Sequence, residues 1–266
     1  VEQGDPYAIH SLGRQLLLFG SSEREKSQGF ELLSRSLELG HTFSMNTLGI
    51  YFLEEGTDHY NPERGLRYLQ ESAARNDIYG FQNMGFVTLN GIGGVKKDPA
   101  AAYEWFRKAS LEGHPTAPSS IGRMYANGQT AGGVDHAKAI EWYDIGLARG
   151  DPWGGTNAAW IILNENPPGY GAGEAAKRAA KAAELRNPET RKIAEELLNS
   201  MSDAEIEAGM VSLAEEFGGK SEEGTDSLVK ALEAEYGRPI VGEGVERLRD
   251  MARLYWENSL LRSDLY

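Results

Sequence analysis

The sequence contains no cysteine, which excludes disulfide bonds and thiolate metal sites and leaves the redox compartment open. No apolar run approaches the roughly 18 residues that a membrane-spanning helix needs, so membrane insertion is not expected. Basic residues are also scarce, because 27 lysines and arginines face 40 acidic residues and give a net charge of −13. This charge argues against nucleic acid and anionic membranes as partners, since both are bound through Lys and Arg.

A repeat of 36 to 37 residues runs through most of the chain. A glycine that follows a hydrophobic residue recurs at Gly13, Gly49, Gly85 and Gly122, and Ala159 continues the same spacing. Two further series keep the same period. They are Gly4, Gly40, Asn76, Gly113, Gly150 and Asn187, and Gly29, Gly65, Ala102, Ala139 and Ala176. Three agreeing series indicate an array of about five repeats.

Each repeat is predicted to contain two helices. The first has apolar or small residues at helical spacing, as in Ala117, Ile121 and Met124. The second often begins with a capping residue before proline, as at Asn61-Pro62 and Asp98-Pro99. Neither helix could bury its apolar face alone, so the repeats must stack into a solenoid.

The glycine-rich stretch "NGIGGVKKDP" (90–99) is interpreted as the turn between the two helices of the third repeat. A phosphate-binding loop is the competing interpretation. That loop would follow a strand and end in Gly-Lys-Ser/Thr, and neither feature is present.

The repeats resemble the Sel1-like repeat, a relative of the tetratricopeptide repeat. The segment "APSSIGRMYANGQTAGGVDHAKAIEWYDIGLARGDP" (117–152) carries the pattern best, and "GGVKKDPAAAYEWFRKASLEGHP" carries the second half of the preceding copy. The resemblance covers about residues 4–187. It implies an all-α, right-handed α/α superhelical solenoid of about five repeats, whose first helices line a concave surface that binds proteins or peptides. Relatives of this kind act as adaptors, signalling regulators, host-interaction factors and inhibitors, in bacteria and eukaryotes.

The face of the first helices that would line this groove lies at offsets 3, 7, 10 and 14 from the residue that ends the preceding repeat. In repeats one and two these positions hold Tyr7, Ser11, Arg14, Leu18, Phe43, Thr47, Ile50 and Glu54. In repeats three to five the candidate partner-binding residues are Tyr79, Asn83, Phe86, Asn90, Arg123, Asn127, Trp153, Asn157 and Trp160. Aromatic residues and arginines dominate binding hot spots, and an asparagine can both donate to and accept from a peptide backbone.

Alternatives stay open for this face. A rotation of the assigned face by about 100° would place the aromatic residues in the helix–helix core, because a short apolar stripe does not fix direction. Asn90 and Asn127 each precede a helix-ending glycine, which favours local capping over ligand contact.

Little supports catalysis. The five histidines include no pair at the i, i+4 spacing of a helical metal site, and His41 and His114 are interpreted as structural. The densest polar cluster, Glu54, Glu55, Asp58 and His59, lies in a predicted turn, where solvation is expected rather than acid–base chemistry. We expect no enzyme activity, no cofactor and no metal site.

After residue 187 the glycine rhythm ends and the charge changes. From Glu189 onward there are 18 acidic and 9 basic residues, a net of −9, against −4 before it. We therefore predict two parts, a repeat array over 1–187 and an acidic helical extension over 188–266. The extension is expected to cap the last repeat, and docking of its final helix on another protein is the alternative.

The sequence thus predicts a non-catalytic adaptor or regulator that binds a protein or peptide in its groove. One alternative is an immunity-type inhibitor that blocks a basic effector enzyme, and a weaker one is an enzyme with carboxylates across the groove. The partner, the oligomeric state and the compartment stay open. Because the chain begins with Val1, a leader could have been removed, which would favour the periplasm or secretion over the cytoplasm.

Overall fold

The structure is a computed structural model that describes residues 5–185, 187–202, 204–206 and 208. Every regular element in these residues is helical, which confirms the predicted all-α class. The chain divides into two compact bodies, Val1–Asp135 and His136–Tyr266, here called the N-terminal and C-terminal bodies. This division falls between the two helices of repeat four, and the predicted boundary at residue 187 stays a prediction. None of the described helices is long and apolar enough to cross a membrane.

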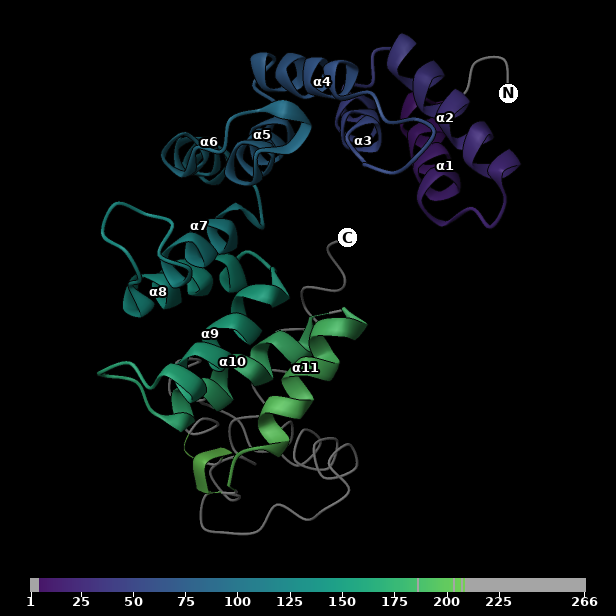
Figure 1. The fold of residues 1–266 in the computed structure, drawn as a ribbon. Helices are drawn as coiled ribbons and strands as arrows, with labels where there is room; N and C mark the ends of the chain where they lie inside the picture. The colour runs from purple at the N-terminus through teal and green to yellow at the C-terminus, as the bar shows by residue number, and fades with distance from the viewer. Residues whose placement is uncertain (1–4, 186, 203, 207, 209–266) are drawn as a thin grey trace. The chain divides into compact units, whose positions relative to one another are not determined.

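The N-terminal body consists of consecutive helix pairs (Figure 1). Its helices are α1 (Pro6–Phe19), α2 (Glu23–Glu38), α3 (Phe43–Phe52), α4 (Pro62–Ala74), α5 (Ile78–Asn90), the 3-10 helix η1 (Ile92–Gly94), α6 (Pro99–Leu111) and α7 (Ala117–Ala126). The two helices of each repeat pack together, and the second helix of a repeat packs against the first helix of the next. The predicted two-helix repeat is therefore present.

The C-terminal body continues the same pattern. Its helices are α8 (His136–Ala148), α9 (Pro152–Glu165), α10 (Ala172–Glu184) and α11 (Pro188–Asn199). The helix α11, which belongs to the predicted acidic extension, packs against α10 and α9. Ser202 and Glu205 of the same extension form a capping box, since Ser202 N donates to Glu205 Oε2 at 2.7 Å and Glu205 N donates to Ser202 Oγ at 3.4 Å. The other helices predicted for the extension lie outside the described residues.

Local sequence chemistry explains where the helices begin and end. Asn61 and Asp98 cap α4 and α6 with their side-chain oxygens, each followed by a proline in the first turn. Gly91 ends α5 in the left-handed conformation at φ 74°, which glycine adopts without steric cost. The stretch from residue 90 to 99 is therefore a turn between α5 and α6, as predicted.

Small residues let the paired helices approach closely. A Cβ atom on Gly85 would lie 2.6 Å from the ring of Phe106, and one on Gly49 would lie 2.6 Å from Leu69. Both large residues are fully buried. The glycines that mark the repeat in the sequence are therefore the points at which the second helix inserts a core side chain over the first.

Candidate functional site

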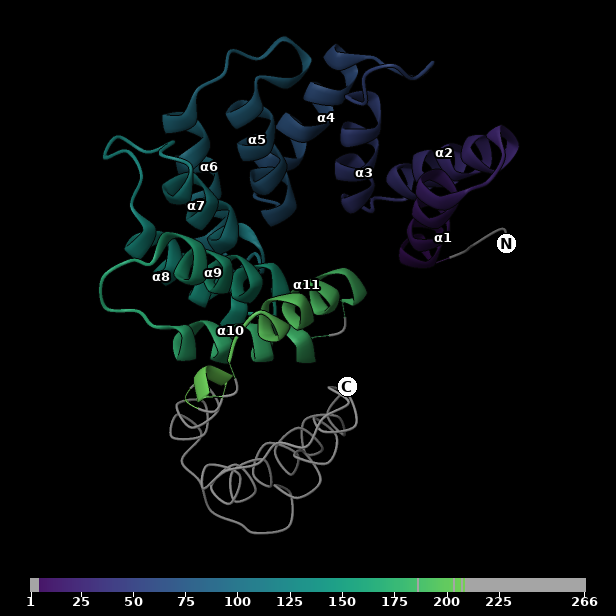
Figure 2. The ribbon, with the colours of Figure 1, turned by 60° about the horizontal axis from the view of Figure 1, so that its bottom comes forward.

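A groove of about 630 Å³ runs along α1, α3 and α5, the first helices of repeats one to three in the N-terminal body. Figure 2 shows these helices within that body. The groove is lined by Tyr7, His10, Ser11, Arg14, Gln15, Leu18, Phe19, Phe43, Asn46, Thr47, Ile50, Tyr51, Glu54, Tyr79 and Asn83. Most of these residues occupy the offsets at which the sequence places a groove-lining face.

The groove is largely apolar and open to solvent. Tyr7 and Leu18 are 66% and 50% exposed, and Phe43 and Ile50 are both 40% exposed. Arg14 and Glu54 are the arginine and the carboxylate of the described lining, one charge of each sign. Exposed aromatic and aliphatic side chains in a hollow are typical of a surface that a partner covers.

Two of the nine candidate residues from repeats three to five line this groove, namely Tyr79 and Asn83. Phe86 and Asn90 lie further along α5, both exposed, and Asn90 Nδ2 donates to the Phe86 carbonyl at 2.9 Å. This hydrogen bond within the last turn of α5 is the local capping role that was the alternative to ligand contact for Asn90. Phe86, which is 40% exposed, is therefore the better candidate for partner contact in this part of α5.

The remaining candidate residues are distributed over both bodies. Arg123 and Asn127 lie at the end of α7 in the N-terminal body, where both are exposed. Trp153, Asn157 and Trp160 belong to α9 in the C-terminal body, where Trp160 is 50% exposed and the other two are half-buried. These five residues are not part of the groove lining, and their role in binding stays a prediction.

A chain of hydrogen bonds sets the orientation of the amides on the groove floor. Asp77, the N-cap of α5, accepts from the Tyr79 and Gly80 amides at 2.9 and 3.0 Å. The same carboxylate oxygen accepts from Asn46 Nδ2 at 3.0 Å, and Asn83 Nδ2 donates to Asn46 Oδ1 at 3.4 Å. A carboxylate oxygen accepts, so Asn46 points its Nδ2 toward Asp77, and its Oδ1 then accepts from the Nδ2 of Asn83. Asn83 therefore has its Oδ1 available to accept from a guest.

Aromatic and imidazole rings form one wall of the groove. His10 and His41 lie 4.7 Å apart between ring centres, His41 and Phe43 lie 5.7 Å apart, and Phe43 and Tyr79 lie 4.7 Å apart. His114 continues this row at 4.7 Å from Tyr79. His41 and His114 are expected from their place in the repeat to be structural, and ring packing of this kind agrees with that role.

His10 was not a candidate residue, yet it lies on the groove wall. Its Nδ1 shares a hydrogen bond of 3.0 Å with the buried Ser44 hydroxyl. Burial, with smaller contributions from the positive charges of His41 and Arg14, lowers the pKa of His10 to about 4. Burial also lowers the pKa of His114 to about 4, against the opposing charge of Asp77. The other repeats have no histidine at the position of His10, so the repeat pattern does not indicate this site. Only the fold brings His10 and Ser44 together.

The groove offers little for catalysis or metal binding. Glu54 is the single carboxylate among the described residues that line it, so the lining contains no pair for acid–base work. Within the described part of the chain, no group of three or more His, Asp or Glu side chains could hold a metal ion.

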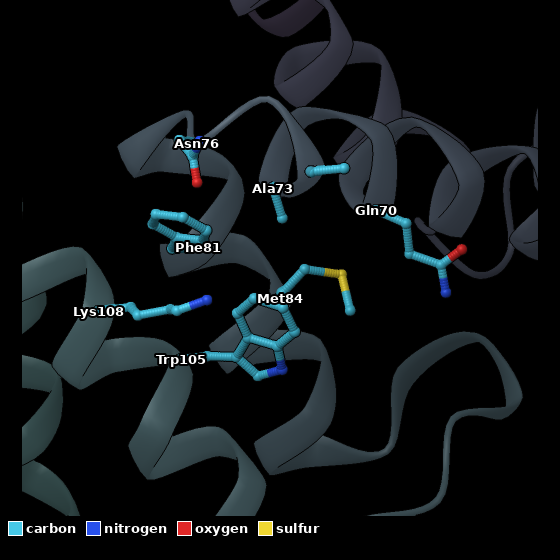
Figure 3. A pocket seen from close by; sticks show the side chains of 8 residues that line it. Gln70, Ala73, Asn76, Phe81, Met84, Trp105 and Lys108 are labelled. Carbon is cyan, nitrogen blue, oxygen red and sulfur yellow. The ribbon is translucent and has the colours of Figure 1, made fainter.

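A second hollow, of about 340 Å³, lies between α4, α5 and α6 (Figure 3). Its walls include Phe81 and Trp105, whose rings stack with centres 6.0 Å apart. The Lys108 ammonium lies 5.2 and 5.6 Å from the two ring centres. Because this cation already covers the aromatic faces, the arrangement supports packing of α5 against α6.

Comparison with known families gives a match to the Sel1 repeat over residues 6–41, 42–77, 82–114 and 120–151, just over half of the chain. No curated protein sequence gives a match. The matched segments correspond to the first four repeats, and the fifth pair, α9 and α10, follows the last of them.

Solved structures with the same fold have TM-scores just above 0.5. A Sel1 repeat protein from Oxalobacter formigenes has a TM-score of 0.52 and 24% identity, covering 71% of this chain and 77% of its own. A protective antigen of uropathogenic Escherichia coli has a TM-score of 0.52 and 21% identity, over 94% of this chain and 54% of its own. An immunity protein from Pseudomonas aeruginosa has a TM-score of 0.51 and 16% identity, covering 78% of this chain and 82% of its own. These similarities establish a helical repeat solenoid.

Proposed function

Because the chain belongs to the Sel1 repeat family, whose repeats generally mediate protein–protein interactions, we propose that it is a non-catalytic adaptor or regulator. Its partner is a segment of another protein that enters the groove along α1, α3 and α5. The observation that supports this proposal is the groove itself, a solvent-open hollow of about 630 Å³ lined by exposed aromatic and aliphatic side chains. When a partner covers such a surface, apolar area is removed from water, which contributes favourably to the free energy of binding.

The chemistry of the groove suggests what the guest must carry. Apolar side chains would pack between Tyr7, Phe43 and Ile50, which are exposed and come from α1 and α3. A hydrogen-bond donor, such as a backbone N–H, would meet the Oδ1 of Asn83, because the other side of that amide already donates toward Asn46. With one arginine and one glutamate in the lining, a guest of near-neutral charge is accommodated without an unpaired charge.

The remaining candidate residues are proposed as contact sites in their own bodies. In the N-terminal body these are Phe86, Asn90, Arg123 and Asn127, and in the C-terminal body they are Trp153, Asn157 and Trp160. Phe86 and Trp160 are the large apolar members whose side chains are at least 40% exposed. They are the residues whose truncation should cost most if the site in either body binds a partner.

The proposal is tested by capturing partners from native lysate on immobilised protein and measuring the affinity of each purified partner by calorimetry. The groove variant Ile50→Glu is expected to lose the partner, because a carboxylate would be buried without a counter-charge. Ile145→Glu is the matched control, since Ile145 on α8 is 39% exposed against 40% for Ile50. Equal affinity for wild type and Ile50→Glu would exclude the groove as the binding site.

A separate arm uses the double variant Phe86→Ala/Trp160→Ala. Loss of the partner from this variant, with Ile50→Glu unaffected, would move the site to the second set of residues. Loss from neither variant would leave the acidic extension or the outer helices as the binding region and would overturn the proposed site.

An immunity-type inhibitor is the second candidate. Two solved structures of the same fold are immunity proteins of Pseudomonas aeruginosa, with TM-scores of 0.51 and 0.50, and the net charge of −13 would attract a basic enzyme. An inhibitor would bind one folded protein tightly with an association rate that falls steeply as salt rises. An adaptor would bind short segments at micromolar strength. Association kinetics of the captured partner at low and high salt separate the two.

A further inference from the structure

The first helices of the N-terminal body carry no negative side chain, although the chain as a whole is strongly acidic. The net charge of the chain is −13, and the second helices α2, α4 and α6 each contain acidic residues. The first helices α1, α3, α5 and α7 contain neither an acidic residue nor a lysine. They contain two arginines, Arg14 on α1 and Arg123 on α7. The helices on the groove side of this body are therefore positive in an acidic protein.

The two arginines occupy the same place in their repeats. Arg14 and Arg123 each follow the buried glycine that marks the repeat, and Ile50 on α3 and Phe86 on α5 hold the equivalent places in the two repeats between them. All four side chains are exposed, with Ile50 and Phe86 both at 40%. We call these four residues the crossing row, because each of the four first helices contributes one member. The crossing row has an apolar centre and a cation at each end.

Side-chain hydrogen bonds join each first helix to the next and hold the crossing row in order. They connect His10 Nδ1 with Ser44 Oγ at 3.0 Å, Asn83 Nδ2 with Asn46 Oδ1 at 3.4 Å, and Gln82 Nε2 with Ser120 Oγ at 2.8 Å. Neighbouring packed helices lie about 8 to 10 Å apart, so three steps separate the two ends of the row by about 24 to 30 Å. An extended peptide, which rises about 3.3 Å per residue, spans this length with about eight residues.

Both arginines of the crossing row are available to a partner. Neither Arg14 nor Arg123 forms an ion pair or a side-chain hydrogen bond with another residue that the structure describes. On the second helix α4, by contrast, Arg75 Nη2 donates to Glu71 Oε1 at 2.7 Å. A guanidinium binds a carboxylate through two parallel N–H···O bonds. The arginines of the row can form such bonds without first losing an ion pair within the protein.

The acidic residues next to the first helices do not neutralise the crossing row. Asp5 and Asp77 accept from backbone amides at the beginning of α1 and α5. Glu54 follows α3 and is the carboxylate of the groove lining, where Arg14 is the arginine. Arg123 lies outside that lining and adds a second positive charge to the surface. The complete row therefore favours a guest that carries more carboxylates than the groove alone would require.

We propose that the protein segment bound by this chain is acidic at both ends and apolar in its middle. Its two carboxylates pair with Arg14 and Arg123, and its apolar side chains cover Ile50 and Phe86. This inference rests on the proposed function, because it specifies the guest of that binding surface. The apolar centre contributes most of the affinity. The two ion pairs set the position of the guest across the helices and disfavour basic segments.

Selection from a phage-displayed library of random 12-residue peptides on the whole immobilised chain tests this charge pattern. The wild type should enrich peptides with Asp or Glu on both sides of apolar residues, and Arg14→Glu/Arg123→Glu should enrich Lys or Arg at those places. Arg24→Glu is the matched control, since Arg24 is exposed on α2, and it should enrich the same peptides as the wild type. An apolar consensus without acidic residues, or a basic one, in the wild type overturns this inference and leaves the proposed groove standing. Enrichment of no sequence by the wild type overturns both.

Calorimetry with a synthetic copy of the enriched acidic peptide tests the pairing of individual charges. Arg14→Glu should weaken binding about 5- to 10-fold, because an attraction at the edge of the interface becomes a repulsion. A second peptide, with Lys in place of the acidic residue that faces Arg14, should bind Arg14→Glu more tightly than it binds the wild type. Ile50→Glu should lose both peptides, which reports on the groove independently of the two arginines. Equal affinity of the wild type and Arg14→Glu for the acidic peptide contradicts the inference.

Discussion

At the scale of single residues, the glycines that mark the repeat are packing positions. Gly85 lies under Phe106 with no room for a Cβ atom, while a Cβ atom on Gly132, in the turn before α8, would meet nothing within 4 Å. A glycine is therefore required for helix packing at Gly85 and is replaceable at Gly132. The repeat position, and not glycine content, predicts which glycine is needed.

Gly85→Ala should destabilise the protein by about 1 to 3 kcal/mol, because the new methyl group must displace the buried Phe106 ring. Gly132→Ala should change stability by less than about 0.5 kcal/mol, as expected for an open surface site. Urea unfolding of both variants measures this difference. Equal stability of the two would show that the helices of repeat three separate at little cost.

The two buried histidines should make stability depend on pH. Their folded-state pKa values of about 4 lie below the ordinary value of 6.5, so the unfolded chain binds protons first as the pH falls. Stability is then fully present above pH 6.5 and is lost as the pH falls from 6.5 toward 4. Each histidine should contribute a loss of about 2 kcal/mol between pH 7 and pH 5.

Urea unfolding at pH 7 and pH 5 measures this effect, in a range above the ordinary titration of most carboxylates. The variant His10→Gln/His114→Gln should lose most of the difference, because glutamine does not titrate. A wild type of equal stability at both values would contradict the effect of burial on these imidazoles.

At the scale of elements, an ion pair between Asp144 and Arg178 connects α8 with α10 in the C-terminal body. Arg178 is 8% exposed, and its Nε and Nη2 each donate to a different oxygen of Asp144 at 2.8 Å. Its Nη1 donates to Glu174 at 2.6 Å on the same helix. These bonds raise the pKa of Arg178 against the opposing effect of burial, so the guanidinium stays charged between the helices.

Arg178→Ala should destabilise the C-terminal body by about 2 kcal/mol, because it removes the partner of Asp144 and leaves a cavity. The cost is below that of a fully buried pair, since Asp144 is 39% exposed. Thermal unfolding measures the loss. The paired variant Arg178→Met/Asp144→Leu should recover much of it, and a double variant as unstable as Arg178→Ala would show that packing, not the uncompensated charge, dominates.

At the scale of the whole molecule, the array continues into the predicted extension through α11. Thr190, Ala194 and Leu198 of this helix are at most 1% exposed, and the helix packs against α10 and α9. The helix α10 has Ala175, Ala176 and Ala179 fully buried between its neighbours.

Truncation separates the contribution of α11 from that of the residues beyond it. A chain ending at Asn187 should be less stable than one ending at Ser202 by about 2 to 4 kcal/mol, mainly because Leu198 and Ala194 no longer bury apolar surface. Thermal unfolding of both forms measures this. Equal melting temperatures would show that α11 is not a cap for the last repeat.

Much of this architecture follows from the sequence alone. The period of 36 to 37 residues, the packing glycines and the caps at Asn61 and Asp98 are local signals, and each predicts a feature that the structure contains. The offsets that predict the groove face also select most of its lining in repeats one to three. They succeed because every first helix packs in the same register on its neighbours.

Tertiary structure alone decided the rest. The bonds that join Asp77, Asn46 and Asn83 connect residues 31 and 37 positions apart, and no local pattern indicates which amides share a carboxylate. The burial of His10 against Ser44, 34 residues away, has the same origin. Burial of this kind depends on neighbours in space rather than in sequence, so no local pattern predicts it.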